Sequence, residues 1–247
     1  MYLTIRGLVL RVTDYNDRDA LVTLLTADHG RMTVKASGLR RKNSPLIAPC
    51  QLLAYGEYTL FEYRGMYTIN EATSIELFRE LRKSLSKLSL GTYMAQVCEV
   101  ICQEDIPSPE LLSLLLNCLY GLSKLNISET MIKAVFEFRC ACLAGYMPEL
   151  EGCVRCGNPS PEHFDVSAGH IECARCRDRM SGGIRMPVSL GILSALRYIA
   201  FCDPKRLFSF SLSEEALEML AQLTETYLVT QLERSFSALD FYKSLLI

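Results

Sequence analysis

Hydrophobic and polar residues alternate along the first third of the chain. This alternation, with its many β-branched residues, predicts five strands, at Tyr2–Val12, Ala20–Thr26, Arg31–Ala36, Leu52–Tyr63 and Met66–Ile75. Asp28-His29-Gly30 and Arg64-Gly65 provide turns between strands. Five short strands in one segment favour a small closed barrel over an open sheet, because closure removes the exposed edges.

From about Ser74 the apolar residues recur at helical spacing, as in the series Leu77, Leu81, Leu85 and Leu88. Helices are predicted at 109–125, where Ser108-Pro109-Glu110 is a strong start signal, and at 128–144, between a Ser128 cap and Gly145. After Pro187 the pattern predicts further helices at Leu190–Phe201, from Ser213 to Val229, and near Phe236–Leu246.

Residues 150–186 have a different composition, with glycines, prolines, short polar segments and four cysteines. The pattern therefore predicts a multi-domain α+β protein in four segments. These are a barrel domain at 1–78, the first part of a helical domain at 79–149, a cysteine-rich insertion at 150–186, and the second part of the helical domain at 187–247.

The four cysteines of the insertion have the spacing of a structural zinc site. Cys153 and Cys156 form one C-x2-C pair, and Cys173 and Cys176 form a second pair sixteen residues later. Two such pairs give a closed tetrahedral set of thiolates. Two disulfides or a redox motif are weaker alternatives in a reducing compartment. Four thiolates also leave no open position for a catalytic water, so His163 and His170 are expected on the surface of the finger, with replacement ligand as the lesser alternative.

The seven remaining cysteines are predicted to pack in the core as small hydrophobic residues: Cys50, Cys98, Cys102, Cys118, Cys140, Cys142 and Cys202. Cys98 and Cys102 are four residues apart on one helix face and are the pair among them that suits two metal ligands, although packing is the commoner role. An odd total of eleven cysteines favours the cytosol over secretion.

A basic stretch lies at the third predicted strand and the loop after it. No acid occurs between Arg31 and Gly56, but five bases do: Arg31, Lys35, Arg40, Arg41 and Lys42. The whole chain has a net charge of −2, so this excess is local. The bases and nearby aromatic residues suit a groove that follows nucleic-acid phosphates. A solvated loop beside ordinary barrel aromatics is the alternative. The candidate aromatics are Tyr55, Tyr58, Phe61, Tyr63 and Tyr67.

The sequence contains no recognisable catalytic motif. Its three histidines do not form a Ser/His or Cys/His arrangement, and no glycine-rich phosphate loop is present. No apolar stretch is long enough to span a membrane, and the N-terminus does not resemble a secretory signal. A binding protein is therefore favoured over an enzyme.

Several short sequence motifs, in their order and spacing along the chain, resemble those of the RecO family of DNA recombination and repair proteins. The resemblance covers essentially the whole chain. It is carried by Thr23–Thr26 with Gly30, Lys35–Ser44, Glu71-Ala72, Phe136–Arg139, Leu143–Leu150 leading into Cys153–Gly157, and Leu232–Leu239.

The resemblance implies an N-terminal OB-fold, a helical domain and a zinc finger. It also implies a cytoplasmic, nucleoid-associated mediator that is not an enzyme, binds single- and double-stranded DNA and anneals complementary strands. Its implied partners are RecR and the C-terminal tail of single-stranded DNA-binding protein, and it helps to load recombinase onto coated gaps.

Lys133 and Arg139 are candidates for docking that acidic tail, because they are basic residues on an otherwise apolar predicted helix. They lie six residues apart and so face different sides of the helix, which means that a second helix must complete any pocket. Solvated helix edges are the alternative for both. For the protein as a whole, the alternative function is a zinc-ribbon adaptor between proteins that does not bind DNA directly.

Overall fold

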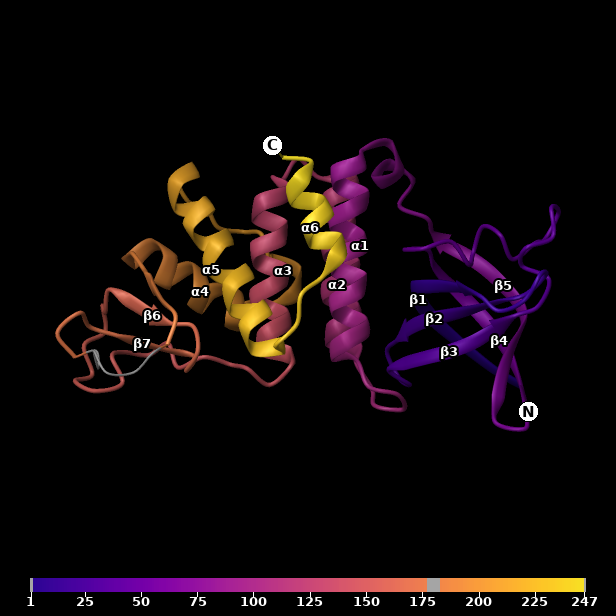
Figure 1. Ribbon diagram of the computed structural model, residues 1–247, viewed down its shortest axis with the longest axis horizontal. Helices are drawn as coiled ribbons and strands as arrows, with labels where there is room; N and C mark the ends of the chain where they lie inside the picture. The colour runs from indigo at the N-terminus through magenta and orange to yellow at the C-terminus, as the bar shows by residue number, and fades with distance from the viewer. Residues whose placement is uncertain (1, 177–182, 247) are drawn as a thin grey trace. The chain divides into compact units, whose positions relative to one another are not determined.

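The computed structural model describes residues 2–176 and 183–246 of the chain, which form two compact units (Figure 1). Unit 1 comprises Met1–Leu125 and Phe236–Ile247, and unit 2 comprises Asn126–Ser235. None of the helices in the described residues is long and apolar enough to cross a membrane.

Unit 1 begins with five strands that form a single sheet. These are β1 (Tyr2–Asp14), β2 (Ala20–Thr26), β3 (Arg31–Ala36), β4 (Tyr55–Tyr63) and β5 (Met66–Glu76), hydrogen-bonded in the order β1-β2-β3-β5-β4. The long strand β1 pairs with both β2 and β4, and its register shifts between Val9 and Arg11. A parallel pairing of Lys35 with Thr68 joins β3 to β5 and closes the sheet into a barrel. Buried side chains such as Val22, Val34 and Leu60 fill its interior.

Helices cover part of the outside of this barrel. Unit 1 also contains the short helix η1 (Arg79–Lys83), α1 (Leu85–Ile101), α2 (Pro109–Lys124) and α6 (Ser237–Ser244). Helix α1 lies against β1 and α2 against β2, so Leu8 and Leu25, which point outward from the barrel, are fully buried. Helix α6 packs on α1, where the Phe236 ring meets the Tyr93 ring edge-on at 5.5 Å.

In its described residues, unit 2 consists of helices and a small sheet. Its helices are α3 (Glu129–Leu143), α4 (Leu190–Phe201), η2 (Pro204–Arg206) and α5 (Glu214–Leu232). The sheet has the order β7-β6-β8, formed by β6 (His163–Asp165), β7 (His170–Glu172) and β8 (Arg185–Pro187). Ser128 and Ser213 cap α3 and α5, since their hydroxyls accept hydrogen bonds from the backbone N–H groups of Met131 and Ala216.

The predicted strands and helices are present, with boundaries shifted by a few residues. By their contacts, α1, α2 and α6 belong to the barrel's unit, whereas α3, α4 and α5 group with the cysteine-rich segment. The cause is tertiary packing: α6 contacts α1, whereas α3 contacts α5 and α4. Residues 177–182 of the predicted 150–186 insertion lie outside the described residues.

Candidate metal centre and basic loops

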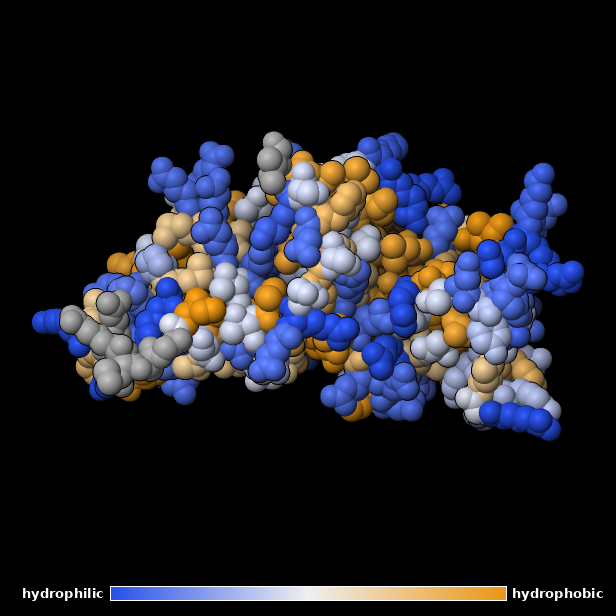
Figure 2. Space-filling view, viewed as in Figure 1, coloured by the Kyte–Doolittle hydropathy of each residue, from blue (hydrophilic) through white to orange (hydrophobic). Residues whose placement is uncertain are grey.

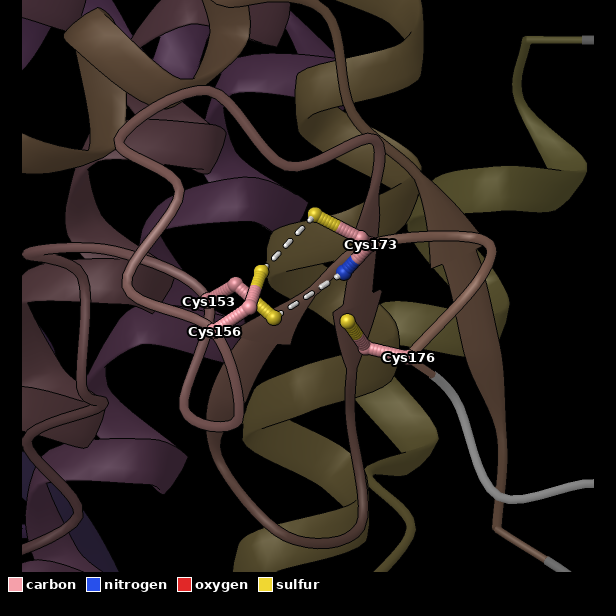
Figure 3. Close-up of side chains that lie close together, drawn as sticks. All are labelled: Cys153, Cys156, Cys173 and Cys176. Atoms are coloured by element: carbon pink, nitrogen blue, oxygen red, sulfur yellow. Dashed lines mark hydrogen bonds between the residues drawn. The ribbon is translucent and has the colours of Figure 1, made fainter.

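Four cysteine side chains from two loops converge in unit 2. Cys153 and Cys156 lie in the loop before β6, and Cys173 and Cys176 directly follow β7. Their sulfur atoms all lie within 4.8 Å of one another, and the four side chains point toward a common centre (Figure 3). The antiparallel pairing of β6 with β7 holds the second pair beside the first. No histidine belongs to this cluster in the described part of the chain, so His163 and His170 are not among its ligands.

The spacing of the sulfurs suits a tetrahedral metal ion. Four ligands at about 2.3 Å from a central zinc would lie about 3.8 Å from one another. The Cys156 and Cys173 sulfurs are 3.8 Å apart, far beyond a disulfide bond of about 2.05 Å, and all four cysteines are free thiols. The cluster therefore has the composition and dimensions of a site that could hold one metal ion.

The ionisation of the four thiols also fits a cation. Burial raises the pKa of Cys153, but backbone N–H groups, first among them that of Cys173 at 3.4 Å, outweigh this and lower it to about 6. The pKa of Cys176 is instead raised to about 12, above all by its interaction with the Cys156 thiol. Four thiols this close together cannot all lose their protons without a cation, because the negative charges would repel one another. A bound divalent cation removes the conflict, because a coordinating thiol loses its proton.

Two arginines that sequence reasoning missed hold the cysteine loops in place. Arg197, on α4, donates from its guanidinium to the backbone carbonyls of Leu150 at 2.8 Å, Glu151 at 3.0 Å and Pro159 at 3.2 Å. Arg185, on β8, pairs with the buried Glu172 at 2.7 Å and with Asp165 at 3.4 Å. The only sequence signal for Arg197 is a lone base in the apolar segment 190–201.

The five predicted DNA-binding bases fall into two groups. Arg31 fastens β3 to the end of α1, since its guanidinium donates to the Glu99 carbonyl at 3.0 Å and pairs with Glu104 at 3.4 Å. Lys35 pairs with Asp19 at 2.9 Å and lies over the Tyr15 ring. Both side chains are thus engaged by protein groups, which the sequence pattern alone did not indicate.

Arg40, Arg41 and Lys42 are exposed on the basic loop, defined here as residues 37–44. A second loop, residues 15–19 between β1 and β2, brings the exposed Arg18 to the same place, because the Arg40 amide donates to the Arg18 carbonyl at 3.1 Å. Sequence reasoning missed Arg18, which is remote from the other bases in the chain. The part of the barrel that extends to the upper right in Figures 1 and 2 is predominantly hydrophilic.

The loop 15–19 and the end of β1 also carry acids. Asp14 pairs with Arg40 at 3.2 Å, Asp19 pairs with Lys35, and Asp17 is exposed. The excess positive charge around the basic loop is therefore smaller than the count from Arg31 to Gly56 suggested. The acids lie close in space but outside that stretch of sequence.

The candidate stacking aromatics are distributed unevenly. Tyr58 is fully buried and donates from its hydroxyl to the Pro49 carbonyl at 2.6 Å, so it belongs to the barrel core. Tyr55 and Tyr67 are half-buried. Phe61 and Tyr63 are exposed, and Phe61 lies 5.3 Å from the ring of Tyr2 on the neighbouring strand β1.

Lys133 and Arg139 both have partners within unit 2. Lys133 is buried, and its ammonium lies 2.9 Å from Glu137 and 2.8 Å from Glu225, so it is not a solvated helix edge. Arg139 donates to the last carbonyls of α4, those of Ile199 at 2.8 Å and Ala200, and so stabilises the end of that helix. These contacts use both cations inside the unit rather than presenting them to a partner.

Comparison with known proteins covers nearly the whole chain. The family model described as "Recombination protein O N terminal" matches residues 1–78, and that described as "Recombination protein O C terminal" matches residues 82–240. The DNA repair protein RecO of Acetivibrio thermocellus is 33% identical over 246 residues, which cover 99% of this chain and 97% of that protein. The protein of the same name from Bacillus subtilis is 30% identical over 90% of this chain and 86% of that protein. The one from Caldicellulosiruptor saccharolyticus is 27% identical over 98% of each chain. The chain therefore belongs to the RecO family of DNA repair proteins.

Proposed function

We propose that this chain is a non-enzymatic mediator of recombinational repair that binds single- and double-stranded DNA and anneals complementary strands. Together with RecR it helps to load recombinase onto single-stranded DNA coated by single-stranded DNA-binding protein. The observation that carries the proposal is the group of exposed bases on two adjoining loops of the barrel, Arg18, Arg40, Arg41 and Lys42, in a chain of the RecO family.

The strand order supports the assignment of the barrel as an OB-fold. OB-folds are five-stranded Greek-key barrels that bind oligonucleotides through strands 2 and 3 and the adjoining loops, including the loop between strands 1 and 2. In this barrel α2 lies against β2, and Arg31 on β3 is tied to α1. The proposal therefore places DNA on the loops 15–19 and 37–44 rather than on the outer face of β2. Lys35 contributes charge there while it remains paired with Asp19.

Annealing requires no catalytic side chain. Cations that neutralise two phosphate backbones at once lower the repulsion between the strands and raise their effective concentration. Base pairing then provides both the specificity and the driving force. Contacts to phosphates alone carry no sequence information, so we expect little sequence preference.

We further propose that Cys153, Cys156, Cys173 and Cys176 hold one structural zinc ion. Four thiolates fill a tetrahedral shell, so the ion would stabilise the loops and would not activate water. The mutual distances of the sulfurs and their crowded ionisation support this assignment. A bound metal would add to the folding free energy of the two cysteine loops, because it joins them through four bonds.

The proposal includes RecR and the acidic tail of single-stranded DNA-binding protein as partners, and the cytoplasm, at the nucleoid, as the location. No docking residues for the tail are assigned, because the internal contacts of Lys133 and Arg139 disfavour these two candidates.

The test is a DNA-binding titration of the Arg41→Ala/Lys42→Ala variant against a labelled oligonucleotide at several salt concentrations. We expect weaker binding to every sequence, and a plot of log K against log[salt] that is flatter by roughly 0.7–0.9 for each phosphate that the variant no longer neutralises. Lys205→Ala/Arg206→Ala removes the same charge from η2 in unit 2 and serves as the matched control. Strand annealing should decline in parallel. Unchanged affinity and slope in the first variant would favour the adaptor function without direct DNA binding.

A further inference from the structure

Asp19 lies at the junction of the two loops and accepts three hydrogen bonds. Its carboxylate receives the backbone N–H of Gly38 at 2.8 Å, the ammonium of Lys35 at 2.9 Å and the side-chain amide of Asn16 at 3.1 Å. Its side chain is 17% exposed. These donors, led by the Gly38 N–H, hold the pKa of Asp19 well below its ordinary value.

Further hydrogen bonds join the loops around Asp19. The Asn16 side-chain oxygen accepts the backbone N–H groups of Arg18 at 2.9 Å and Asp19 at 2.8 Å. Arg40 donates from its guanidinium to the Asn16 carbonyl at 2.8 Å and from its amide to the Arg18 carbonyl. The loop 15–19 and the basic loop are therefore one hydrogen-bonded structure, although residues 20–36 separate them in the chain.

Gly38 gives the basic loop its shape beside Asp19. Its φ of +70° is in the left-handed region that favours glycine, and a Cβ added there would lie 3.4 Å from the Arg41 side chain. Gly38, whose N–H donates to Asp19, thus lies next to the Arg41 side chain. Asp19 is placed to determine where the exposed cations of both loops point.

An acid beside a phosphate site is unfavourable on charge alone, because it repels the anionic backbone. We propose that Asp19 is a positioning residue: it orders the two loops so that Arg18, Arg41 and Lys42 form one site for the phosphodiester backbone of nucleic acid. This inference rests on the proposed function, and it adds Arg18 and Asp19 to the site. The carboxylate makes the site effective by ordering its cations before binding, which lowers the entropy lost when DNA binds.

Positioning and simple electrostatics predict opposite results for Asp19→Ala. The substitution removes one negative charge and frees the Lys35 ammonium, so electrostatics alone predicts tighter DNA binding with a steeper salt dependence. Positioning predicts weaker binding, on the order of tenfold, with a flatter salt dependence, because disordered loops engage fewer phosphates.

The experiment measures fluorescence anisotropy of a labelled single-stranded oligonucleotide with the full-length protein at several salt concentrations. Asp17→Ala is the matched control, since it removes the same charge from an exposed position on the same loop. It should bind DNA at least as tightly as the unsubstituted protein. Asn16→Ala leaves the charge unchanged but removes two acceptor bonds and the amide donor to Asp19, so it should also weaken binding. Thermal unfolding of each variant reports whether the barrel remains folded.

Tighter binding by Asp19→Ala, to the extent seen with Asp17→Ala, would overturn the positioning role while leaving the proposed DNA binding intact. Should Asp19→Ala fail to fold, undiminished affinity in a folded Asn16→Ala variant would overturn it. Absence of salt-dependent binding by the unsubstituted protein would overturn both the inference and the proposed function.

Discussion

Replacing Lys133 with methionine removes the cation from a buried charge cluster between α3 and α5. The ammonium lies within 2.9 Å of both Glu137 and Glu225. Glu137 is fully buried, whereas the Glu225 side chain is 22% exposed and can turn toward water. The substitution therefore takes the Lys133 ammonium away from the buried Glu137 carboxylate, which also accepts a hydrogen bond from the Thr224 hydroxyl at 3.0 Å.

Breaking a buried ion pair by removing one partner costs about 3–5 kcal/mol. The lower end of this range applies here, because the partly exposed Glu225 carboxylate can be hydrated. For a cooperative unit of roughly 110 residues, each kcal/mol lowers the unfolding temperature by roughly 4 °C, so we expect a decrease of roughly 12 °C for unit 2. Differential scanning calorimetry or circular dichroism of the full chain measures it.

The loss of stability should depend on pH. In the unsubstituted protein burial opposes the charge on Lys133, but Glu137 and Glu225 outweigh it and raise the pKa. The contribution of the charged Lys133 side chain to stability is therefore fully present below pH 10.5, its ordinary pKa. It is lost only as the pH rises through the higher pKa of the folded state. In Lys133→Met the buried Glu137 loses the nearby Lys133 ammonium, which favours the protonated form of its carboxyl group. The variant should then lose less stability at pH 5 than at pH 8, because protonation removes the buried charge.

The double variant Lys133→Met/Glu137→Met is the control, since it removes both buried members of the charge cluster. Apolar replacement of a buried pair is often neutral or stabilising, so most of the lost stability should return. Thr224 keeps its second bond, to the Ala221 carbonyl at 3.2 Å. An unfolding temperature of Lys133→Met within about 2 °C of the original, a shift that corresponds to well under 1 kcal/mol, would refute the reasoning. Loss of affinity for an acidic peptide without loss of stability would instead restore Lys133 as a docking residue.

Three further predictions concern the metal site and the barrel. Cys176→Ser should lower zinc binding from one ion per chain and destabilise unit 2; elemental analysis that finds equal metal in both proteins would contradict the four-cysteine site. Arg197→Met should loosen the first cysteine loop, because three carbonyls lose their donor, and faster reaction of the cysteines with a thiol reagent would report it; an unchanged rate would argue against anchoring. Gly30→Ala should destabilise unit 1 by about 3 kcal/mol or more, whereas Gly65→Ala should cost only about 1–2 kcal/mol. Both glycines have positive φ, but a Cβ at Gly30 would lie 2.3 Å from the Ile106 carbonyl oxygen and nothing lies within 4 Å of one at Gly65; equal unfolding temperatures for the two variants would contradict this.

The secondary structure and the cysteine cluster could be predicted from the sequence because short-range rules govern them. Alternation marked the strands, and serine caps at 128 and 213 marked two helix starts that the structure confirms. The paired C-x2-C spacing identified all four members of the sulfur cluster, because a two-residue spacer brings both thiols of a pair to one point. Family membership could likewise be predicted from short sequence motifs in a characteristic order.

Only the tertiary structure decided which charged side chains are available to bind a partner molecule. Arg31, Lys133 and Arg139 are engaged by groups 60 or more residues away or by a neighbouring helix, and Arg18 joins Arg40 across a loop. It also decided that α6 packs with α1 in unit 1 rather than with α4 and α5. The physical reason is the range of the interactions. Periodicity and caps depend on neighbours within about one helical turn or one strand pair. The partner of a charge, and whether it is buried, depends on chain segments that folding alone brings together.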